Sequence, residues 1–201
     1  MIYFDHNATT PLDDRVVEAM LPFLQNWYGN PSALYRMGRA VRSAIETARA
    51  QVAALVAVDA AQVIFTSGGT EANNLALRQV AVGAKLVVSA LEHPSVMVPA
   101  QHWQRQNQQL IVATVATDGQ IEQAPLAALP WKRGDLLSIQ LANNETGVLQ
   151  DFSAIAEHAR AHGAVIHTDA VQAVGKISVD FSQTRAQLLS LSSHKIGRAH
   201  V

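Results

Sequence analysis

Short apolar runs that alternate with helix-like segments are the feature that most restricts how this chain can fold. Six runs are apolar on both faces and mostly β-branched or Leu, which is typical of buried parallel strands. They cover residues 63–66, 85–90, 110–115, 136–142, 164–168 and 188–191. Helices are expected over residues 34–58, 71–82, 94–106 and 153–162. This order predicts an α/β fold with a mostly parallel sheet and helices on both faces.

Composition narrows the class of protein further. Of 201 residues, 49% are hydrophobic and 15% charged, which indicates a packed domain rather than a disordered chain. The net charge is −1, and Lys and Arg form no basic stripe, so neither nucleic acid nor an anionic membrane is an expected partner. No run reaches the roughly 18 apolar residues that a membrane helix needs, and the N-terminus lacks a secretory signal. A cytoplasmic protein is expected. The absence of cysteine excludes disulfides and thiolate metal sites, and no metal site is expected.

A glycine turn follows the first apolar run and precedes an expected helix. Ser67-Gly68-Gly69-Thr70 would let backbone amides approach a ligand closely, and the helix N-terminus adds unpaired N–H groups. The Thr70 side chain adds a hydroxyl. The segment is therefore a candidate phosphate site, although it is no Walker motif. An ordinary tight turn with a Ser/Thr cap is the alternative.

Polar residues follow four further runs, at the points where the expected strands end. These segments are residues 91–93, 143–147, 167–172 and 192–195. Each segment alone is weak evidence for a functional site. An isolated histidine such as His93 is more often structural, and an isolated lysine such as Lys195 is more often a solvated surface residue. In open α/β sheets, however, ligands bind at the carboxyl ends of the strands. Their shared placement therefore indicates one site.

These residue types match the needs of pyridoxal phosphate (PLP) chemistry. PLP requires a lysine for covalent attachment and proton transfer, and a carboxylate that keeps the pyridine nitrogen protonated. An aromatic group must lie on the ring face, a donor must hold the ring hydroxyl, and hydroxyls and amides must take the phosphate. The sequence supplies a candidate for each role.

Seven short motifs follow one another along the chain. They are FDHNATTP at 4–11, GNPS at 29–32, TSGGTEANN at 66–74, EH at 92–93, NNETG at 143–147, HTDAVQ at 167–172 and SSHK at 192–195. In this order they resemble the cysteine desulfurase family, which is class V aminotransferase-like with PLP fold type I. The resemblance runs from residue 3 to about 196.

The resemblance implies a role for individual residues. Lys195 is implied to form the Schiff base, and His93 to stack on the ring and assist proton transfer; these are the two catalytic residues. Asp169 is implied to pair with the pyridinium nitrogen, Gln172 to meet the ring hydroxyl, and Asn144 to lie beside ring and substrate. The implied phosphate ligands are Gly69, Thr70, Ser192 and His194.

The resemblance also implies an activity and partners. The family forms homodimers that convert L-cysteine to L-alanine and leave sulfur as a persulfide on an enzyme cysteine. The sulfur then passes to iron–sulfur scaffold proteins or other acceptors for thiolated cofactors. Because this chain has no cysteine, we expect an N-terminal fragment that lacks the persulfide cysteine and the small C-terminal domain, and is inactive.

We expect three parts in the chain. Residues 1–30 are expected as an N-terminal arm and residues 31–196 as an incomplete PLP-binding large domain. Residues 197–201 depart from the family's Gly-Pro turn and are expected to be a non-native tail.

Other readings stay open at this point. A selenocysteine lyase, a cysteine sulfinate desulfinase or another class V aminotransferase-like enzyme would share these motifs. A non-catalytic scaffold protein is the alternative of another class, but it predicts a damaged set of ring-binding residues, and here the set is present.

Overall fold

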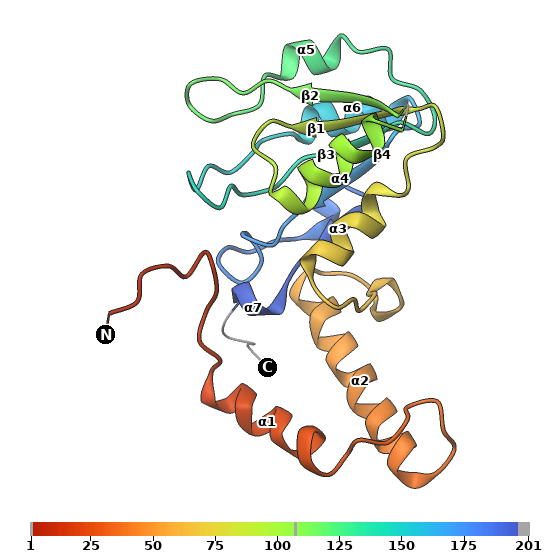
Figure 1. Ribbon diagram of the computed structural model, residues 1–201, viewed down its shortest axis with the longest axis vertical. Helices are drawn as coiled ribbons and strands as arrows, with labels where there is room; N and C mark the ends of the chain where they lie inside the picture. Colours follow the sequence, from red (N-terminus) through yellow and green to blue (C-terminus); the bar gives the residue numbers. More distant parts are fainter. Residues whose placement is uncertain (1, 107, 197–201) are drawn as a thin grey trace. The chain divides into compact units, whose positions relative to one another are not determined.

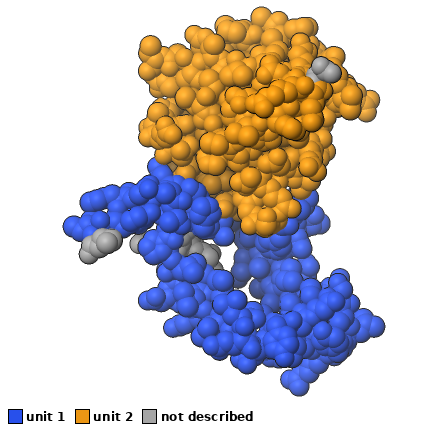
Figure 2. Space-filling model, in the orientation of Figure 1, with its two compact units in different colours: residues 1–65, 193–201 blue, residues 66–192 orange. Residues whose placement is uncertain are grey.

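The computed structural model describes residues 2–106 and 108–196, which belong to two compact units (Figure 2). One unit comprises residues 1–65 together with 193–201, and the other comprises residues 66–192. The tail expected at residues 197–201 lies outside the described residues.

The second unit is built on a five-stranded sheet (Figure 1). Its spatial order is β2-β1-β3-β4-β5, and every neighbouring pair is parallel. This arrangement confirms the parallel sheet expected from the apolar runs. The strands are β1 (Lys85–Ser89), β2 (Gln109–Ala113), β3 (Leu136–Ser138), β4 (Val165–Asp169) and β5 (Leu188–Ser190).

Helices cover both faces of this sheet. On β1, Leu86 and Val88 join an apolar cluster with Leu77 of α3 (Gly69–Leu77) and Val96 of α4 (Pro94–Gln104). Val87, between them, lies in a second cluster with residues of α5 (Gln123–Ala127) and α6 (Ser153–Ala161). Successive strand residues point to opposite faces, so these two clusters are the two sides of the sheet.

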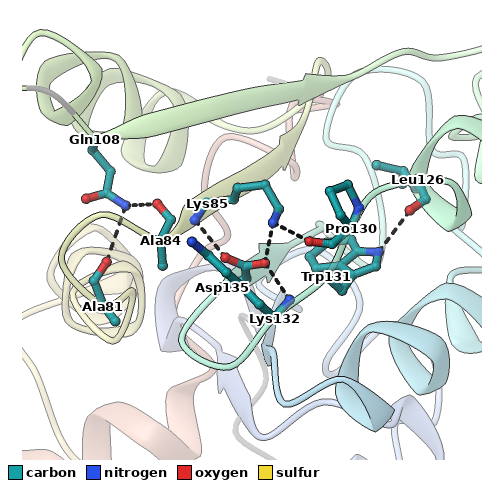
Figure 3. Close-up of polar contacts among 9 residues, drawn as sticks. All are labelled: Ala81, Ala84, Lys85, Gln108, Leu126, Pro130, Trp131, Lys132 and Asp135. Carbon is teal, nitrogen blue, oxygen red and sulfur yellow. Dashed lines mark hydrogen bonds and ion pairs between the residues drawn. The ribbon is translucent and has the colours of Figure 1, made fainter.

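A buried ion pair joins the starts of β1 and β3 (Figure 3). The Nζ atom of Lys85 lies 2.6 Å from Oδ2 of Asp135, and the two side chains are 6% and 0% exposed. Asp135 also accepts the backbone N–H groups of Lys85 and Lys132, at 2.8 and 2.9 Å, and Lys85 Nζ donates to the Pro130 carbonyl at 2.7 Å. The ammonium of Lys85 and both carboxylate oxygens of Asp135 therefore have polar partners. A buried charge is tolerated in a fold when it is paired and hydrogen-bonded in this way.

The first unit contains α1 (Asp14–Gln25), α2 (Arg36–Leu55), the 3-10 turn η1 (Ala60–Gln62) and α7 (Ser193–Ile196). Helix α1 falls within the arm expected at residues 1–30 and was not predicted as a helix. Pro22 lies inside it, and a proline in a helical pattern normally signals a helix end. None of its residues is buried.

The prediction of a strand at residues 63–66 is wrong, because the structure has no strand at these positions. The Val63 carbonyl accepts a hydrogen bond from the Arg49 side chain, whose guanidinium lies 5.0 Å from the centre of the Phe65 ring. The Val63 N–H bonds back to Ala60. An apolar run becomes a strand only when a neighbouring strand takes its backbone groups, and here a side chain and a turn take those of Val63.

Candidate functional site

The candidate site lies at the carboxyl ends of the strands in the second unit. The strand order reverses between β1 and β3, since β1 connects through α4 to β2 on one side while β3 lies on its other side. Parallel sheets bind ligands at such a point. His93 follows β1, Asn144 follows β3, Asp169 ends β4 and Ser192 follows β5.

Asp169 is fixed as a hydrogen-bond acceptor. Its side chain is buried; Oδ1 accepts the backbone N–H of Val171 at 2.9 Å, and Oδ2 accepts the Asn73 amide at 2.8 Å. Two donors hold the carboxylate in one orientation at the end of its strand. A carboxylate held in this way suits an N–H cation such as a pyridinium.

His93 is the N-cap of α4 and is solvent-exposed. Its Nδ1 atom lies 3.1 Å from the backbone nitrogen and 2.7 Å from the hydroxyl of Ser95. The Ser95 hydroxyl lies 2.9 Å from the same Asn73 amide nitrogen that bonds to Asp169. The structure therefore links two predicted site residues, His93 and Asp169, through Asn73 and Ser95, to which the sequence analysis assigned no role.

Glu92 places a second carboxyl group beside Asp169. It is 7% exposed, and its Oε1 accepts the backbone N–H of Gln140 at 2.8 Å. Its Oε2 has no partner within the described residues. Burial raises the pKa of Glu92 well above its ordinary value; the bond from Gln140 opposes this rise, and the nearby Asp169 charge adds to it. The environment of Glu92 therefore favours the neutral acid.

The glycine turn and Ser192 lie together. Gly68 is the N-cap of α3, Gly69 is its first residue, and a β-carbon placed on Gly69 would be 3.6 Å from Ser192 Cβ. The Ser67 N–H donates to the Glu71 carboxylate at 2.6 Å, and this bond lowers the pKa of Glu71. Gly69, Thr70 and Ser192 thus share a region that includes the N–H groups of the first turn of a helix, which suits an anion.

Asn144 and Gln172 lie on the turns after β3 and β4, and both are half-buried. The turn of Asn144 is held by its neighbour Asn143, whose Oδ1 accepts the backbone N–H groups of Glu145 and Thr146 at 2.9 and 2.8 Å. Gln172 Oε1 accepts a bond from Lys176.

His194 and Lys195 belong to the first unit, on the short helix α7. The His194 carbonyl accepts the backbone N–H and the hydroxyl of Thr10, at 3.1 and 2.9 Å. Lys195 Nζ donates to the Asn7 carbonyl. Two residues of the opening motif, Asn7 and Thr10, thus form hydrogen bonds with the helix that carries Lys195. The motif alone did not predict these contacts.

The residues present fit PLP by their chemistry. The second unit offers a buried carboxylate for a ring N–H, an exposed imidazole, and a glycine turn at a helix N-terminus for a phosphate. In the described part of the chain, no group of three or more His, Asp or Glu side chains could hold a metal ion. No helix among the described residues is long and apolar enough to cross a membrane.

The sequence profile of the aminotransferase class-V family matches residues 2–198, and the chain belongs to this family. Class-V aminotransferases and cysteine desulfurases are PLP-dependent proteins. The family membership confirms the resemblance stated from the motifs.

Individual relatives make the comparison more specific. The chain is 38% identical over 200 residues to a cysteine desulfurase of Nostoc sp., which covers 98% of this chain and 50% of that protein. The structure of a NifS-like protein matches with a TM-score of 0.91 and 31% identity, over 96% of this chain and 55% of that one. A structure of SspA in complex with cysteine matches with a TM-score of 0.90 and 29% identity, over 98% and 58%. This chain spans about half the length of the curated relatives it matches.

Proposed function

We propose that this chain is the cofactor-binding part of a PLP-dependent cysteine desulfurase that converts L-cysteine to L-alanine. One observation carries the proposal most. A buried carboxylate, Asp169, is fixed by two donors at a strand end and is linked through hydrogen bonds to an exposed imidazole, His93. The relatives named cysteine desulfurase support the choice of reaction.

In this proposal each residue has a defined task. PLP, when bound, withdraws electrons from the substrate and so makes its Cα proton acidic. Asp169 would accept the ring N–H, and Lys195 would supply the amine for covalent attachment and take the Cα proton. His93 would stack on the ring face and move a proton at Nε2. Gln172 would hold the ring hydroxyl and Asn144 would lie beside ring and substrate, while Gly69, Thr70, Ser192 and His194 would hold the phosphate.

The proposal extends to residues and partners outside this chain. A cysteine thiolate must accept the sulfur as a persulfide, and this chain has no cysteine. We therefore assign that cysteine to a part of the protein beyond these residues, together with a small C-terminal domain. We also assign residues 1–30 to an N-terminal arm and residues 31–196 to the cofactor domain of a cytoplasmic homodimer. Its sulfur passes to iron–sulfur scaffold proteins or to other acceptors.

Covalent trapping of the cofactor tests the lysine assignment in the full-length protein. Borohydride reduction should fix one PLP per subunit in the wild type and none in Lys195→Ala, because no other amine is assigned to the cofactor. Lys132→Ala is the matched control and should retain one PLP per subunit. Mass spectrometry of the reduced proteins gives the stoichiometry. One PLP still fixed in Lys195→Ala would contradict the assignment.

A further inference from the structure

Four side chains of the second unit form one continuous chain of hydrogen bonds. The Asn73 amide nitrogen lies 2.8 Å from Asp169 Oδ2 and 2.9 Å from Ser95 Oγ, and Ser95 Oγ lies 2.7 Å from His93 Nδ1. Asn73 and Ser95 are 1% and 8% exposed, so no bulk water competes for these bonds. The chain leads from a buried carboxylate to an exposed imidazole.

The direction of every bond in this chain follows from Asp169. A carboxylate accepts hydrogen bonds and cannot donate them, so Asn73 must turn its NH₂ group toward it. The second hydrogen of that NH₂ group then points to Ser95, whose hydroxyl accepts it. The hydroxyl hydrogen of Ser95 is left for His93 Nδ1.

The backbone of α4 requires the same direction. The Ser95 N–H also points at His93 Nδ1, at 3.1 Å, and a hydrogen on Nδ1 would collide with it. Nδ1 is therefore an acceptor, and the neutral imidazole carries its proton on Nε2.

The orientation of the Asn73 amide leaves one of its own polar atoms without a hydrogen bond to any described residue. Its Oδ1 atom is buried and has no hydrogen-bond partner within the described residues. A buried amide oxygen without a donor is unfavourable, so the two bonds made by the nitrogen must offset the loss.

We propose that Asn73 and Ser95 are positioning residues that transmit the acceptor character of Asp169 to His93 and fix the imidazole as the Nε2–H tautomer. The catalytic consequence rests on the function proposed above: His93 presents a proton donor, and not a base, at its exposed nitrogen. The tautomer itself depends only on contacts within the second unit.

Ring-nitrogen NMR of the cofactor-free, full-length protein tests the tautomer directly. With histidine labelled with ¹⁵N in the ring, the His93 signals are identified by their loss in His93→Asn. The wild type should show a protonated Nε2 and an unprotonated, hydrogen-bonded Nδ1. Ser95→Ala removes one of the two donors to Nδ1, so the fraction of the Nδ1–H tautomer should rise by about fivefold.

Three further variants separate positioning from a general effect on folding. Ser95→Thr retains the hydroxyl and should restore the wild-type signals. Ser89→Ala removes another buried serine hydroxyl, one that bonds to the Leu91 N–H and to no histidine in the described part of the chain, and should leave the His93 signals unchanged. Asp169→Asn allows the Asn73 amide to turn and should shift the His93 Nδ1 signal without altering Ser95, the residue that bonds to Nδ1.

Two results would overturn the inference. One is a wild-type His93 that carries its proton on Nδ1. The other is a His93 spectrum that Ser95→Ala or Asp169→Asn leaves unchanged.

Kinetics of the full-length enzyme provide an independent readout. Ser95→Ala should lower kcat for L-cysteine by about tenfold while KM changes little, because the substrate contacts remain and only the proton donor is misaligned. Ser95→Thr should recover most of the rate, and a Ser95→Ala enzyme with wild-type kcat would contradict the catalytic consequence. A wild type with no desulfurase activity but with the expected tautomer would refute the proposed function and leave the tautomer inference standing.

Discussion

Glu92 and Asp169 are buried carboxyl groups in opposite hydrogen-bond environments. Asp169 accepts bonds on both oxygens, whereas Glu92 accepts one on Oε1 and has an unpartnered Oε2 within the described residues. Two charges so close together would repel each other. The structure separates their roles: Asp169 is placed to be the charged group, and burial favours the neutral form of Glu92.

Replacing Glu92 with glutamine tests this separation. Because burial raises the pKa of Glu92, its neutral form stabilises the fold at low pH, and this contribution is lost as pH rises through the folded-state pKa. The Glu92→Gln protein lacks this loss. We expect the two proteins to differ little in stability near pH 4, below the ordinary pKa of a glutamate, and Glu92→Gln to be more stable by about 1 kcal/mol or more at pH 8. Urea unfolding across this pH range measures the difference.

Glu157→Gln, on the exposed face of α6, serves as the control and should change stability little at either pH. A Glu92→Gln protein whose stability runs parallel to that of the wild type at all pH values would show that Glu92 titrates normally.

The sequence predicted candidate site residues but not the contacts between them. His93 and Asp169 were predicted from their positions after apolar runs, and the structure connects them. Asn73 and Ser95 connect them, but neither has a pattern of its own, because each acts only through partners far away in the sequence. Such contacts arise from the packing of α3 and α4 on the sheet.

Between elements, the ion pair of Lys85 and Asp135 joins β1 to β3 where both strands begin (Figure 3). Burial alone would raise the pKa of Asp135. Hydrogen bonds from Lys85 and Lys132, with the charge of Lys85, outweigh burial and lower it. The ionised pair therefore stabilises the fold above the ordinary carboxyl range, and this contribution is lost as pH falls through the folded-state pKa.

The Asp135→Asn variant should unfold more easily by about 3 kcal/mol, since it leaves the buried ammonium of Lys85 without its counter-charge. Chemical unfolding at pH 7 measures this loss, and the gap to the wild type should narrow as pH is lowered below about 4. Asp118→Asn is the control: Asp118 also accepts a backbone N–H in a turn but is exposed and forms no buried ion pair with a described residue. Equal stability of Asp135→Asn and wild type would mean that the pair contributes nothing.

Expected and observed strands differ where a side chain, and not a neighbouring strand, forms the hydrogen bond to a backbone group. The run at 136–142 yields a strand only to Ser138, because the Gln140 N–H bonds to the Glu92 side chain and not to β1. The run at 63–66 forms no strand, since the Arg49 side chain takes the Val63 carbonyl. The pattern of apolar residues indicates which residues are buried. It does not indicate which group will form a hydrogen bond with a given backbone N–H or carbonyl.

At the scale of the whole molecule, the proposed desulfurase reaction needs a cysteine thiolate, and this chain has no cysteine. We predict that the purified 201-residue chain, given PLP, L-cysteine and a reductant, releases no sulfide above a heat-killed control. The physical reason is that no cysteine is present to accept the sulfur. Sulfide detection in metal-free buffer makes the measurement.

The full-length protein in the same assay is the positive control and should turn over. Catalytic sulfide release by the 201-residue chain alone would show that the reaction does not use an enzyme persulfide, and a lyase with another acceptor would replace the desulfurase proposal.

The sequence by itself determined the class of fold and the family, and it predicted polar residues where the strands end. These follow from apolar runs, glycine turns and short motifs, which are local properties of the chain. Only the tertiary structure decided which side chains carry the contacts between segments: Asn73 and Ser95 between Asp169 and His93, and Asn7 beside Lys195. The reason is that a hydrogen bond requires two groups within about 3 Å, and for distant segments that proximity exists only after the elements have packed.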